Sequence, residues 1–370
     1  MSRGKTNRKI SFLAGYQQRS KAAMQVRDFI KHLKNGERPP LTLILGEESA
    51  LRQQAQHAIA SMIPEDQQAM NFGRYDMQQT PVGAALNDAT SMPFFGDYRE
   101  VVIDDPYFLT GEKNADKIDH DLAGLQAYFE NPVPSTMMVI IAPYKKLDER
   151  KRLTKALKKA ALIVNAAPLD EREARAALAQ TFKKHQVTID APALDTLVQR
   201  TNGQYSIMMG EVRKLLTYAS DGSPLTVAAV EALVPKQLND RVFDLVTDVL
   251  RKNAAAALAL YRDLLAQREE PIRLNALMLG QFRLLLQVKL LAKKGYSQGD
   301  IAGTLKAHPY RVKLAMRQVD RLPYQQLATA YSGLVDTETA MKTGTIDKAL
   351  AFELFMLKYT GQQSGKHVRG

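Results

Sequence analysis

Short strand candidates, most of them continuously apolar, alternate with segments of helical spacing over the first 165 residues. The strand candidates are residues 41–45, 72–76, 99–104, 136–142 and 162–165. Apolar residues fall on one face of a helix over residues 24–34, 49–62, 82–89, 122–130 and 148–160. Apolar strands that alternate with helices predict a parallel sheet in an α/β domain.

The pattern changes at Pro168, after which helical spacing continues and no convincing strand follows. A small helical group is expected from residues 169–185, 191–200, 206–219 and 227–233. A second, larger group is expected from residues 240–252, 254–267, 271–294, 297–305, 309–320, 323–341 and 346–359. The broad apolar stripe of residues 271–294 predicts a bundle core or a subunit interface.

These patterns predict three domains and two tails. The expected parts are a basic disordered tail at 1–21, an α/β domain at 22–167, a small helical domain at 168–236, a larger helical domain at 237–360 and a polar tail at 361–370. A chain of 370 residues is long enough for two or three domains.

Beyond these patterns, the composition indicates the net charge of the protein and where in the cell it is expected to work. The net charge is +12, and half of it comes from residues 1–21, which hold six cations and no acid. Such a chain suits a nucleic-acid partner without requiring one. The absence of cysteine excludes disulfides and thiol catalysis. No apolar run approaches the length of about 20 residues that a membrane span needs, so we expect a soluble, cytoplasmic protein.

The strand candidate at 41–45 runs into Gly46 and then into a helix, which is the layout of a P-loop. A P-loop requires the pattern G-x-x-x-x-G-K-[S/T]. Gly46 fits its first position, but Leu51, Arg52 and Gln53 occupy the last three. Leu51 carries a Cβ where the backbone should approach phosphate, and Gln53 lacks the hydroxyl that binds Mg²⁺. We therefore expect a degenerate P-loop that binds no nucleotide.

Other catalytic chemistry has little support. The strand that ends at Asp104 and Asp105 is similar to the one that holds Mg²⁺ in P-loop enzymes, but surface carboxylates are the plainer interpretation. The strand before Ala142-Pro143 offers no polar residue to position an attacking water. The six histidines show no metal-ligand spacing. We expect no catalytic residue, no metal and no cofactor.

Two adjacent phenylalanines, Phe94 and Phe95, follow Met92-Pro93 at the junction between a helix and a strand. The proline and Gly96 favour a loop. One interpretation is that both rings fill the core of the α/β domain. The other is an apolar wedge that enters a pocket on a partner, where each ring contributes about 1.5–3 kcal/mol.

Residues 297–305 and 309–320 have the spacing of a helix-turn-helix, with Ser297 and Pro309 at the helix starts. Residues 297–318 would then read DNA. The second interpretation is an ordinary packed helix pair, which the strong flanking helices favour.

Several of these stretches together resemble the delta subunit of the bacterial DNA polymerase III clamp loader, over about residues 24–360. The resemblance rests on their order and spacing. The stretches are Leu45-Gly46-Glu47-Glu48, Ser91-Met92-Pro93-Phe94-Phe95-Gly96, Lys146-Leu147-Asp148-Glu149-Arg150-Lys151, Val242-Phe243-Asp244-Leu245, Gln281-Phe282-Arg283-Leu284-Leu285, His308-Pro309-Tyr310, Lys342-Thr343-Gly344 and Ala349-Leu350-Ala351-Phe352-Glu353-Leu354.

The resemblance implies an AAA+-like α/β domain, a helical lid domain and a helical collar domain that joins a five-subunit ring. It implies a subunit that does not hydrolyse ATP. It also implies that the tip formed by Met92, Pro93, Phe94 and Phe95 binds the ring-shaped beta sliding clamp and favours its opening for loading onto primed DNA. ATP bound by sister subunits would expose or hide this tip.

The partners implied are the beta sliding clamp, the gamma/tau ATPase and delta-prime subunits, and primer–template DNA in the assembled complex, with no membrane. The lack of cysteine favours delta over its ring neighbours, which carry a cysteine zinc module and a Ser-Arg-Cys motif. Two alternatives remain open. One is an ATP-hydrolysing AAA+ replication factor that uses Arg52 and Asp104, and the other is a stand-alone DNA-binding protein that uses residues 297–318.

Overall fold

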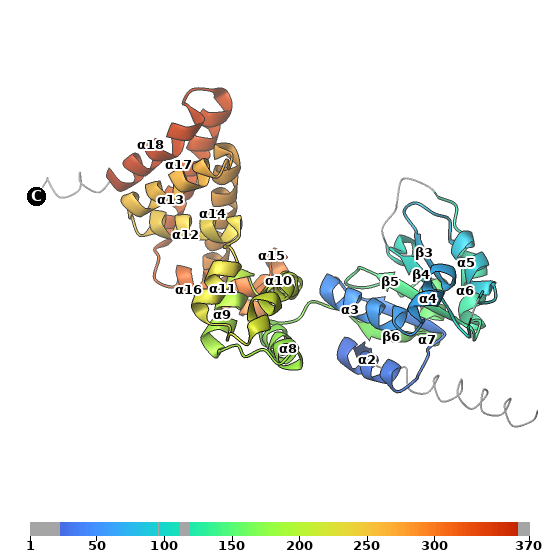
Figure 1. Ribbon diagram of the computed structural model, residues 1–370. Helices are drawn as coiled ribbons and strands as arrows, with labels where there is room; N and C mark the ends of the chain where they lie inside the picture. Colours follow the sequence, from blue (N-terminus) through green and yellow to red (C-terminus); the bar gives the residue numbers. More distant parts are fainter. Residues whose placement is uncertain (1–22, 95, 112–117, 362–370) are drawn as a thin grey trace, which may run out of the picture. The chain divides into compact units, whose positions relative to one another are not determined.

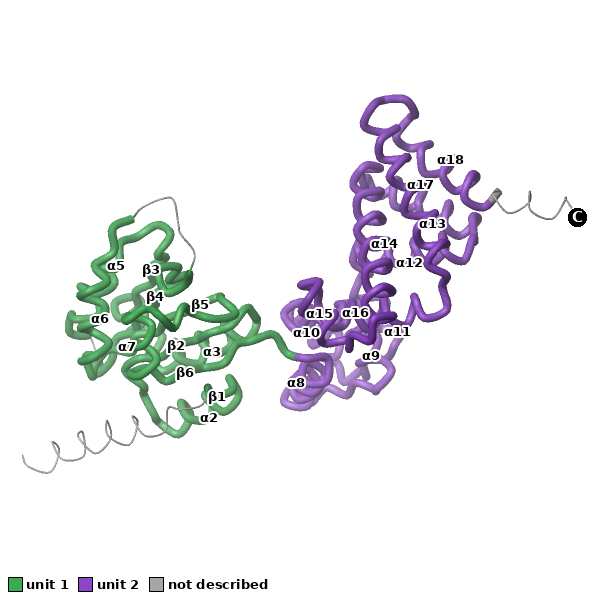
Figure 2. Tube along the Cα trace, turned by 180° about the vertical axis from the view of Figure 1, so that it is seen from behind, with its two compact units in different colours: residues 1–169 green, residues 170–370 purple. Residues whose placement is uncertain are grey.

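The computed structural model describes residues 23–94, 96–111 and 118–361 (Figure 1). The expected tails lie outside the described residues, apart from Gly361, and so does Phe95. The chain forms two compact units, residues 1–169 and 170–370 (Figure 2).

The first unit is built on one six-stranded sheet whose strands are all parallel. Its order in space is β1-β6-β2-β5-β4-β3. The strands are β1 Met24–Gln25, β2 Leu41–Leu45, β3 Phe72–Asp76, β4 Arg99–Asp104, β5 Thr136–Ala142 and β6 Leu162–Asn165. The five predicted strands are confirmed, and so is the α/β class. The two-residue β1 was missed because it lies in a segment that we expected to be helical from Met24.

Helices cover both faces of this sheet (Figure 1). One face carries α5 Val82–Thr90, α6 Leu122–Glu130 and α7 Arg152–Ala160, and the opposite face carries α2 Val26–Lys34 and α3 Ser49–Ala60. Fully buried residues such as Leu43, Val101 and Ile140 form the core under α5, α6 and α7. The helix expected at 148–160 begins later, at Arg152, because the Asp148 carboxylate accepts the Arg150 amide and holds a turn there.

Helix α4, Glu65–Asn71, was not predicted. Its sequence has no apolar periodicity, so the pattern that marks the other helices is missing. Acidic residues in its first turn favour the helix, since they complement its dipole. The Gln68 side chain donates to the carbonyls of Ala60 and Ile63, at 3.2 and 3.0 Å, and fixes the turn between α3 and α4. Hydrogen bonds to the preceding turn therefore support this helix, which apolar periodicity does not predict.

The described part of the second unit is helical, apart from a bridge between Ile189 and Leu225 and the short 3-10 turn η2 at Ala219–Asp221. Its helices are α8 Glu171–Lys184, α9 Ala191–Arg200, α10 Tyr205–Tyr218, α11 Val227–Leu233, α12 Leu238–Leu250, α13 Ala254–Ala266, α14 Pro271–Lys293, α15 Gln298–Leu305, α16 Pro309–Val319, α17 Tyr324–Thr343 and α18 Lys348–Gly361. The expected all-α half is confirmed.

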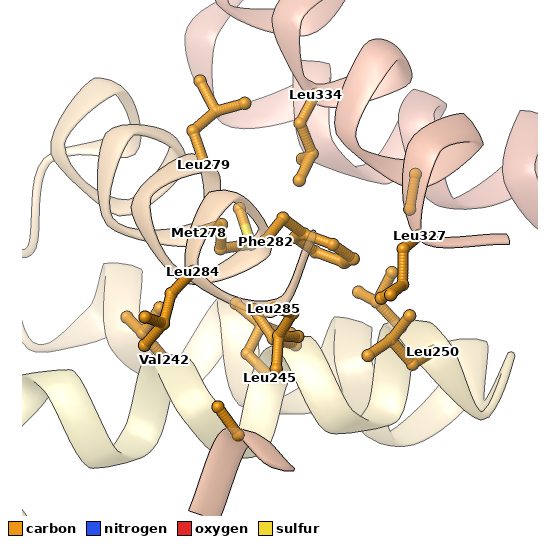
Figure 3. Packing of buried hydrophobic residues seen from close by; sticks show 14 of the residues in the cluster. Val242, Leu245, Leu250, Met278, Leu279, Phe282, Leu284, Leu285, Leu327 and Leu334 are labelled. Carbon is orange, nitrogen blue, oxygen red and sulfur yellow. The ribbon is translucent and has the colours of Figure 1, made fainter. Parts of the chain in front are cut away.

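Helix α14 forms the centre of the larger helical group (Figure 3). Met278, Phe282 and Leu285 are fully buried between α12 and α17, which supply Leu245 and Leu327. Among the described residues, α14 is also the one helix long and apolar enough to cross a membrane by length and composition. Its buried side chains instead identify it as the core helix of the bundle, as the stripe at 271–294 predicted.

The segments expected as lid and collar pack against each other within the second unit. Asn202 Nδ2 donates to Asp240 at 2.6 Å, and Lys313 Nζ lies 2.6 Å from the Glu171 carboxylate. These contacts join the two segments into one compact unit. The division into 168–236 and 237–360 remains a prediction.

Candidate functional site

The loop between α5 and β4 carries the predicted tip. Phe94 is 65% exposed and Met92 is 87% exposed, while Pro93 is half-buried. The interpretation that places Phe94 in the core is therefore wrong. Phe95 lies outside the described residues, and its role remains a prediction.

The Phe94 backbone is held although its side chain is exposed. Its N–H donates to Oδ1 of Asn71 at 2.8 Å, and Asn71 is fully buried at the end of α4. Gly96 has a φ of +74°, a conformation that favours glycine. A Cβ at this position would lie 2.2 Å from Oε1 of Gln67 on α4. The loop is thus hydrogen-bonded to α4 at Phe94 and lies close against α4 at Gly96.

Two further exposed apolar side chains flank the buried Asn71, and sequence reasoning missed both of them. Met70 is the penultimate residue of α4, and Phe72 is the first residue of the edge strand β3. We call Met70, Phe72, Met92 and Phe94 the apolar tip. Met70 was missed because helix α4 was not predicted. Without that helix, the sequence does not indicate that Met70 lies near Phe94 or that its side chain is exposed.

A polar cluster connects the elements beneath the apolar tip. Arg99 at the start of β4 pairs with Asp88 of α5 and donates to the Met70 carbonyl at 3.1 Å. The Tyr75 hydroxyl of β3 donates to Asp88 at 3.0 Å. Burial and this hydrogen bond raise the pKa of Tyr75. Since the contacts join α4, α5, β3 and β4, they limit the freedom of the tip.

Glu100, the next residue of β4, is fully buried. It pairs in the sheet with Phe72 of the apolar tip on one side and with Met137 on the other. Neither carboxylate oxygen has a hydrogen-bond partner among the described residues. Burial raises the pKa of Glu100 to about 8, with the positive charge of Arg74 opposing the shift. The carboxyl group is therefore protonated near neutral pH.

The degenerate P-loop is shorter than a phosphate-binding loop. Helix α3 already begins at Ser49, two residues before the position of the second glycine. Gly46 has a φ of +145°, and a Cβ there would lie 2.0 Å from the carbonyl carbon of Ala166. The Glu48 N–H donates to the Ala166 carbonyl at 2.9 Å. The loop thus packs against the end of β6 and uses the Glu48 amide internally.

Arg52 lies over this loop rather than in solution. Its Nη1 donates to the Gly46 carbonyl at 2.7 Å. Burial lowers the pKa of Arg52, and the charges of Glu48, Asp104 and Glu47 oppose the shift. By contrast, Leu51 is buried and Gln53 is exposed. The guanidinium therefore holds the turn through the carbonyl of Gly46.

Beside Arg52, a hollow of about 540 Å³ lies along the carboxyl ends of the central strands. Three carboxylates line it, those of Asp76, Asp104 and Asp105. Asp104 pairs with Arg74, and Asp105 accepts hydrogen bonds from Tyr144 and Gln78. No cluster of three or more potential metal ligands occurs in the described residues. Two cations, Arg52 and Arg74, line the hollow together with the three carboxylates.

Comparison with known proteins adds family information to this geometry. The family model of the DNA polymerase III delta subunit matches residues 43–167, and the model of the C-terminal domain of that subunit matches residues 239–359. The DNA polymerase III subunit delta of Bacillus subtilis strain 168 is 39% identical over 334 residues, which cover 90% of this chain and 96% of that protein. The chain belongs to the DNA polymerase III delta subunit family. A solved structure described as the Bacillus subtilis DNA clamp loader delta protein matches this delta subunit with a TM-score of 0.71 and 39% identity, over 91% of this chain and 99% of that one.

The possible helix-turn-helix of this delta subunit is a packing unit. Tyr310 of α16 is buried, and its ring contacts Gly203, where an added Cβ would lie 3.1 Å from the ring. Arg311 donates to Gln281 of α14, and Lys313 pairs with Glu171 of α8. Because α16 packs through these side chains inside the unit, the contacts support the packed helix pair. DNA reading by residues 297–318 stays a prediction.

Proposed function

We propose that this delta subunit is the part of the clamp loader that binds the sliding clamp through the apolar tip and favours its opening for loading onto primed DNA. The exposure of Phe94 on a fastened loop carries the proposal. Large apolar side chains are rarely left in water without a partner when they lie together. A loop that is already ordered loses less conformational entropy on binding, which increases affinity.

The tip favours opening only if it binds the opened clamp better than the closed one. A ligand shifts a conformational equilibrium by its difference in affinity for the two states, and tight binding alone shifts nothing. An apolar tip satisfies this condition when opening exposes or widens its pocket on the clamp. The subunit then needs no chemistry of its own, in agreement with the sequence prediction of no catalytic residue.

We further propose that this subunit neither binds nor hydrolyses ATP. The Arg52–Gly46 hydrogen bond, the short loop and the three carboxylates of the hollow support this. An active ATPase would require Arg52 to leave the carbonyl of Gly46 and accept phosphate instead. Equilibrium binding of labelled ATP to the full chain tests the proposal, and saturable micromolar binding would overturn it.

Replacing Phe94 with alanine is expected to weaken clamp binding by about 10-fold or more. Loss of a buried phenylalanine contact costs about 1.5–3 kcal/mol, and aromatic anchors often dominate an interface. Binding of the full chain to the purified clamp, followed by surface plasmon resonance, measures the change.

The matched control is Leu122→Ala, which removes an exposed apolar side chain of the same unit outside the tip. It should leave clamp affinity within about two-fold, since it removes no tip contact. Both variants should keep the wild-type circular dichroism spectrum. If Phe94→Ala binds the clamp as well as the wild type does, the tip assignment fails.

The second unit offers a surface for the proposed ring neighbours, the gamma/tau ATPase and delta-prime subunits. Leu350, Leu354 and Leu357 are exposed on α18. Their spacing of four and then three residues places them along one face of the helix. A hollow of about 450 Å³ lies between α17 and α18 and includes Leu354. We propose that this face packs in the collar and that the protein works in the cytoplasm, on primer–template DNA, as part of the complex.

Changing Leu350 and Leu357 to serine is expected to weaken assembly with the other clamp-loader subunits by at least about 10-fold, because each loses apolar area buried at the interface. Analytical size-exclusion chromatography of the reconstituted complex measures this. The control is Leu290→Ser, an exposed leucine on α14 of the same unit. Equal assembly of all three proteins would show that α18 is not in the interface.

A further inference from the structure

The apolar tip is small for a surface that binds a protein by itself. It consists of four side chains, whereas a stable protein interface uses about 20–30 residues and about 800 Å² on each partner. A round patch of about 800 Å² has a radius of about 16 Å. A clamp that binds the tip should therefore also contact residues within that distance of it.

The tip lies at the edge of the sheet where the parallel strands begin. Phe72 is the first residue of β3, and Phe94 comes five residues before the first residue of β4, Arg99. Strands β2, β5, β4 and β3 are neighbours in this order, and all of them run in the same direction. The neighbourhood of the tip therefore includes the chain segments that precede β2 and β4.

One side chain from each of these two segments takes part in a contact at this edge. Arg38 belongs to the loop before β2, and Tyr98 is the residue just before β4. The guanidinium carbon of Arg38 lies 4.8 Å from the centre of the Tyr98 ring, the distance of a cation–π contact. Tyr98 is four residues from Phe94, and four residues span at most about 14 Å. The pair is therefore close enough to the tip to share its interface.

The Arg38 side chain is held in place but keeps donors for another molecule. The residue is half-buried, and its Nε is buried without a hydrogen-bond partner among the described residues. Nη1 makes a long hydrogen bond, of 3.5 Å, to the Gly36 carbonyl. Nη2 is not buried and donates to no described residue. A guanidinium has five N–H donors, so this one can bind an acceptor on a partner without leaving the Tyr98 ring.

No carboxylate in the part of the chain that the structure describes forms an ion pair with Arg38. The preceding residue, Glu37, lies 2.9 Å from Nδ1 of His32 instead. By contrast, Arg99 at the start of β4 already pairs with Asp88. The charge of Arg38 thus remains available beside the tip.

The surroundings of Arg38 favour a protein carboxylate over a nucleic acid as its partner. Phosphate backbones are bound by several cations together, whereas the charged residues next to Arg38 and Tyr98 in sequence include two acids, Glu37 and Asp97. Arginine and aromatic residues beside exposed apolar side chains are typical of protein interfaces. A guanidinium also matches a carboxylate through two parallel hydrogen bonds.

We propose that Arg38 binds a carboxylate of the sliding clamp next to the pocket that the apolar tip enters, and that Tyr98 positions the guanidinium for this contact. The choice of the clamp as partner rests on the proposed function. The tip supplies most of the affinity, while the charged contact fixes the orientation in which the clamp binds. Two separate contacts prevent the clamp from turning about the tip.

The test is binding of the full chain to the purified clamp, followed by surface plasmon resonance over a range of salt concentrations. Arg38→Gln should weaken binding by about 10-fold or more, because it removes a charged, hydrogen-bonded contact. It should also make the affinity less sensitive to salt, since an ion pair is lost. Arg38→Lys should recover only part of the affinity, because an ammonium lacks the planar fork of donors.

The positioning role of Tyr98 has a readout of its own. Tyr98→Leu removes the ring but leaves the charge of Arg38. It should weaken clamp binding by about 3-fold in the otherwise wild-type chain. It should have little further effect in the Arg38→Gln chain, since the ring acts through Arg38. An effect of the same size in both chains would contradict the positioning role.

The matched control is Arg27→Gln, which removes the same charge near the start of α2. Arg27 is exposed and follows the carboxyl end of β1, so it lies at the opposite edge of the sheet from the tip. The control should leave clamp affinity within about two-fold. Equal losses in Arg38→Gln and Arg27→Gln would reduce the effect to net charge and overturn the proposal. It is also overturned if Arg38→Gln weakens binding of duplex DNA and not of the clamp.

The outcomes for Arg38 and for Phe94 are separate. If Phe94→Ala weakens clamp binding and Arg38→Gln does not, the tip assignment stands and the Arg38 contact is refuted. If Arg38→Gln weakens binding and Phe94→Ala does not, the Arg38 contact stands and the tip assignment fails. Circular dichroism shows whether each variant keeps the wild-type fold. Should Tyr98→Leu not fold, the comparison of Arg38→Gln with Arg38→Lys still decides whether Arg38 binds the clamp.

Discussion

Replacing Glu100 with glutamine is expected to make the first unit more stable at pH 8 and to remove the part of the pH dependence of its stability that Glu100 contributes. In the unfolded chain the Glu100 carboxyl loses its proton near pH 4.5, while in the folded chain it keeps the proton up to a pKa of about 8. Between these values the folded state binds more protons than the unfolded state. The free energy of unfolding therefore falls as pH rises through this window and levels off above it.

The size of this effect follows from the shift in pKa. Each unit of pKa corresponds to about 1.4 kcal/mol, so the wild type should lose on the order of 4 kcal/mol between pH 4.5 and 8. Hydrogen–deuterium exchange of peptides from β4 and β5, corrected for intrinsic exchange, measures the local stability at each pH. Glu65→Gln on α4 is the control, since Glu65 is exposed. A wild-type profile that is flat between pH 5 and 8 would contradict the raised pKa.

Replacing Gly46 with alanine is expected to destabilise the first unit by about 3–5 kcal/mol, because a φ of this kind is almost restricted to glycine and the added group meets backbone. The φ is +145°, and the Cβ would lie 2.0 Å from the Ala166 carbonyl carbon and 2.1 Å from its oxygen. These are main-chain atoms that β6 holds in place, so no side chain can move aside. Relief requires a shift between β2 and β6.

Gly83→Ala is the control for this substitution. Gly83 lies in α5, where an added Cβ meets nothing within 4 Å. Alanine should stabilise this helix by up to about 1 kcal/mol. Hydrogen exchange of β2 and β6 peptides distinguishes the two variants. If Gly46→Ala retains wild-type protection there, the loop is more adaptable than its packing indicates, and its role as a fixed structural turn fails.

The fold could be predicted largely because its strands are apolar. Strand β5 is buried at every position from Thr136 to Ala142, and such a run is recognisable without its partners. The short strand β1 and helix α4 could not be predicted, because neither has a recognisable apolar pattern and both depend on contacts outside their own residues. Helix α4 needs the Gln68 contacts to the end of α3, and β1 needs its pairing with β6.

Only part of the candidate site could be predicted from the sequence. Adjacent phenylalanines between proline and glycine indicated a loop, and Phe94 is exposed as the wedge interpretation required. Met70 and Phe72 could not be found in this way. They become part of the apolar tip because Asn71, buried between them, accepts the Phe94 N–H from 23 residues along the chain. A hydrogen bond between residues this far apart cannot be predicted from the pattern of neighbouring residues.

The hydrogen bond from Arg52 to the Gly46 carbonyl has a consequence for how the cell's energy state affects this protein. A nucleotide that binds only the folded protein stabilises it by about 2.7 kcal/mol when its concentration is about 100 times its Kd. If this loop binds no nucleotide, as we propose, the protein receives no such contribution. The melting temperature of this chain should then not depend on the ATP concentration in the cell. The melting temperature of a nucleotide-binding neighbour should increase with the ATP concentration.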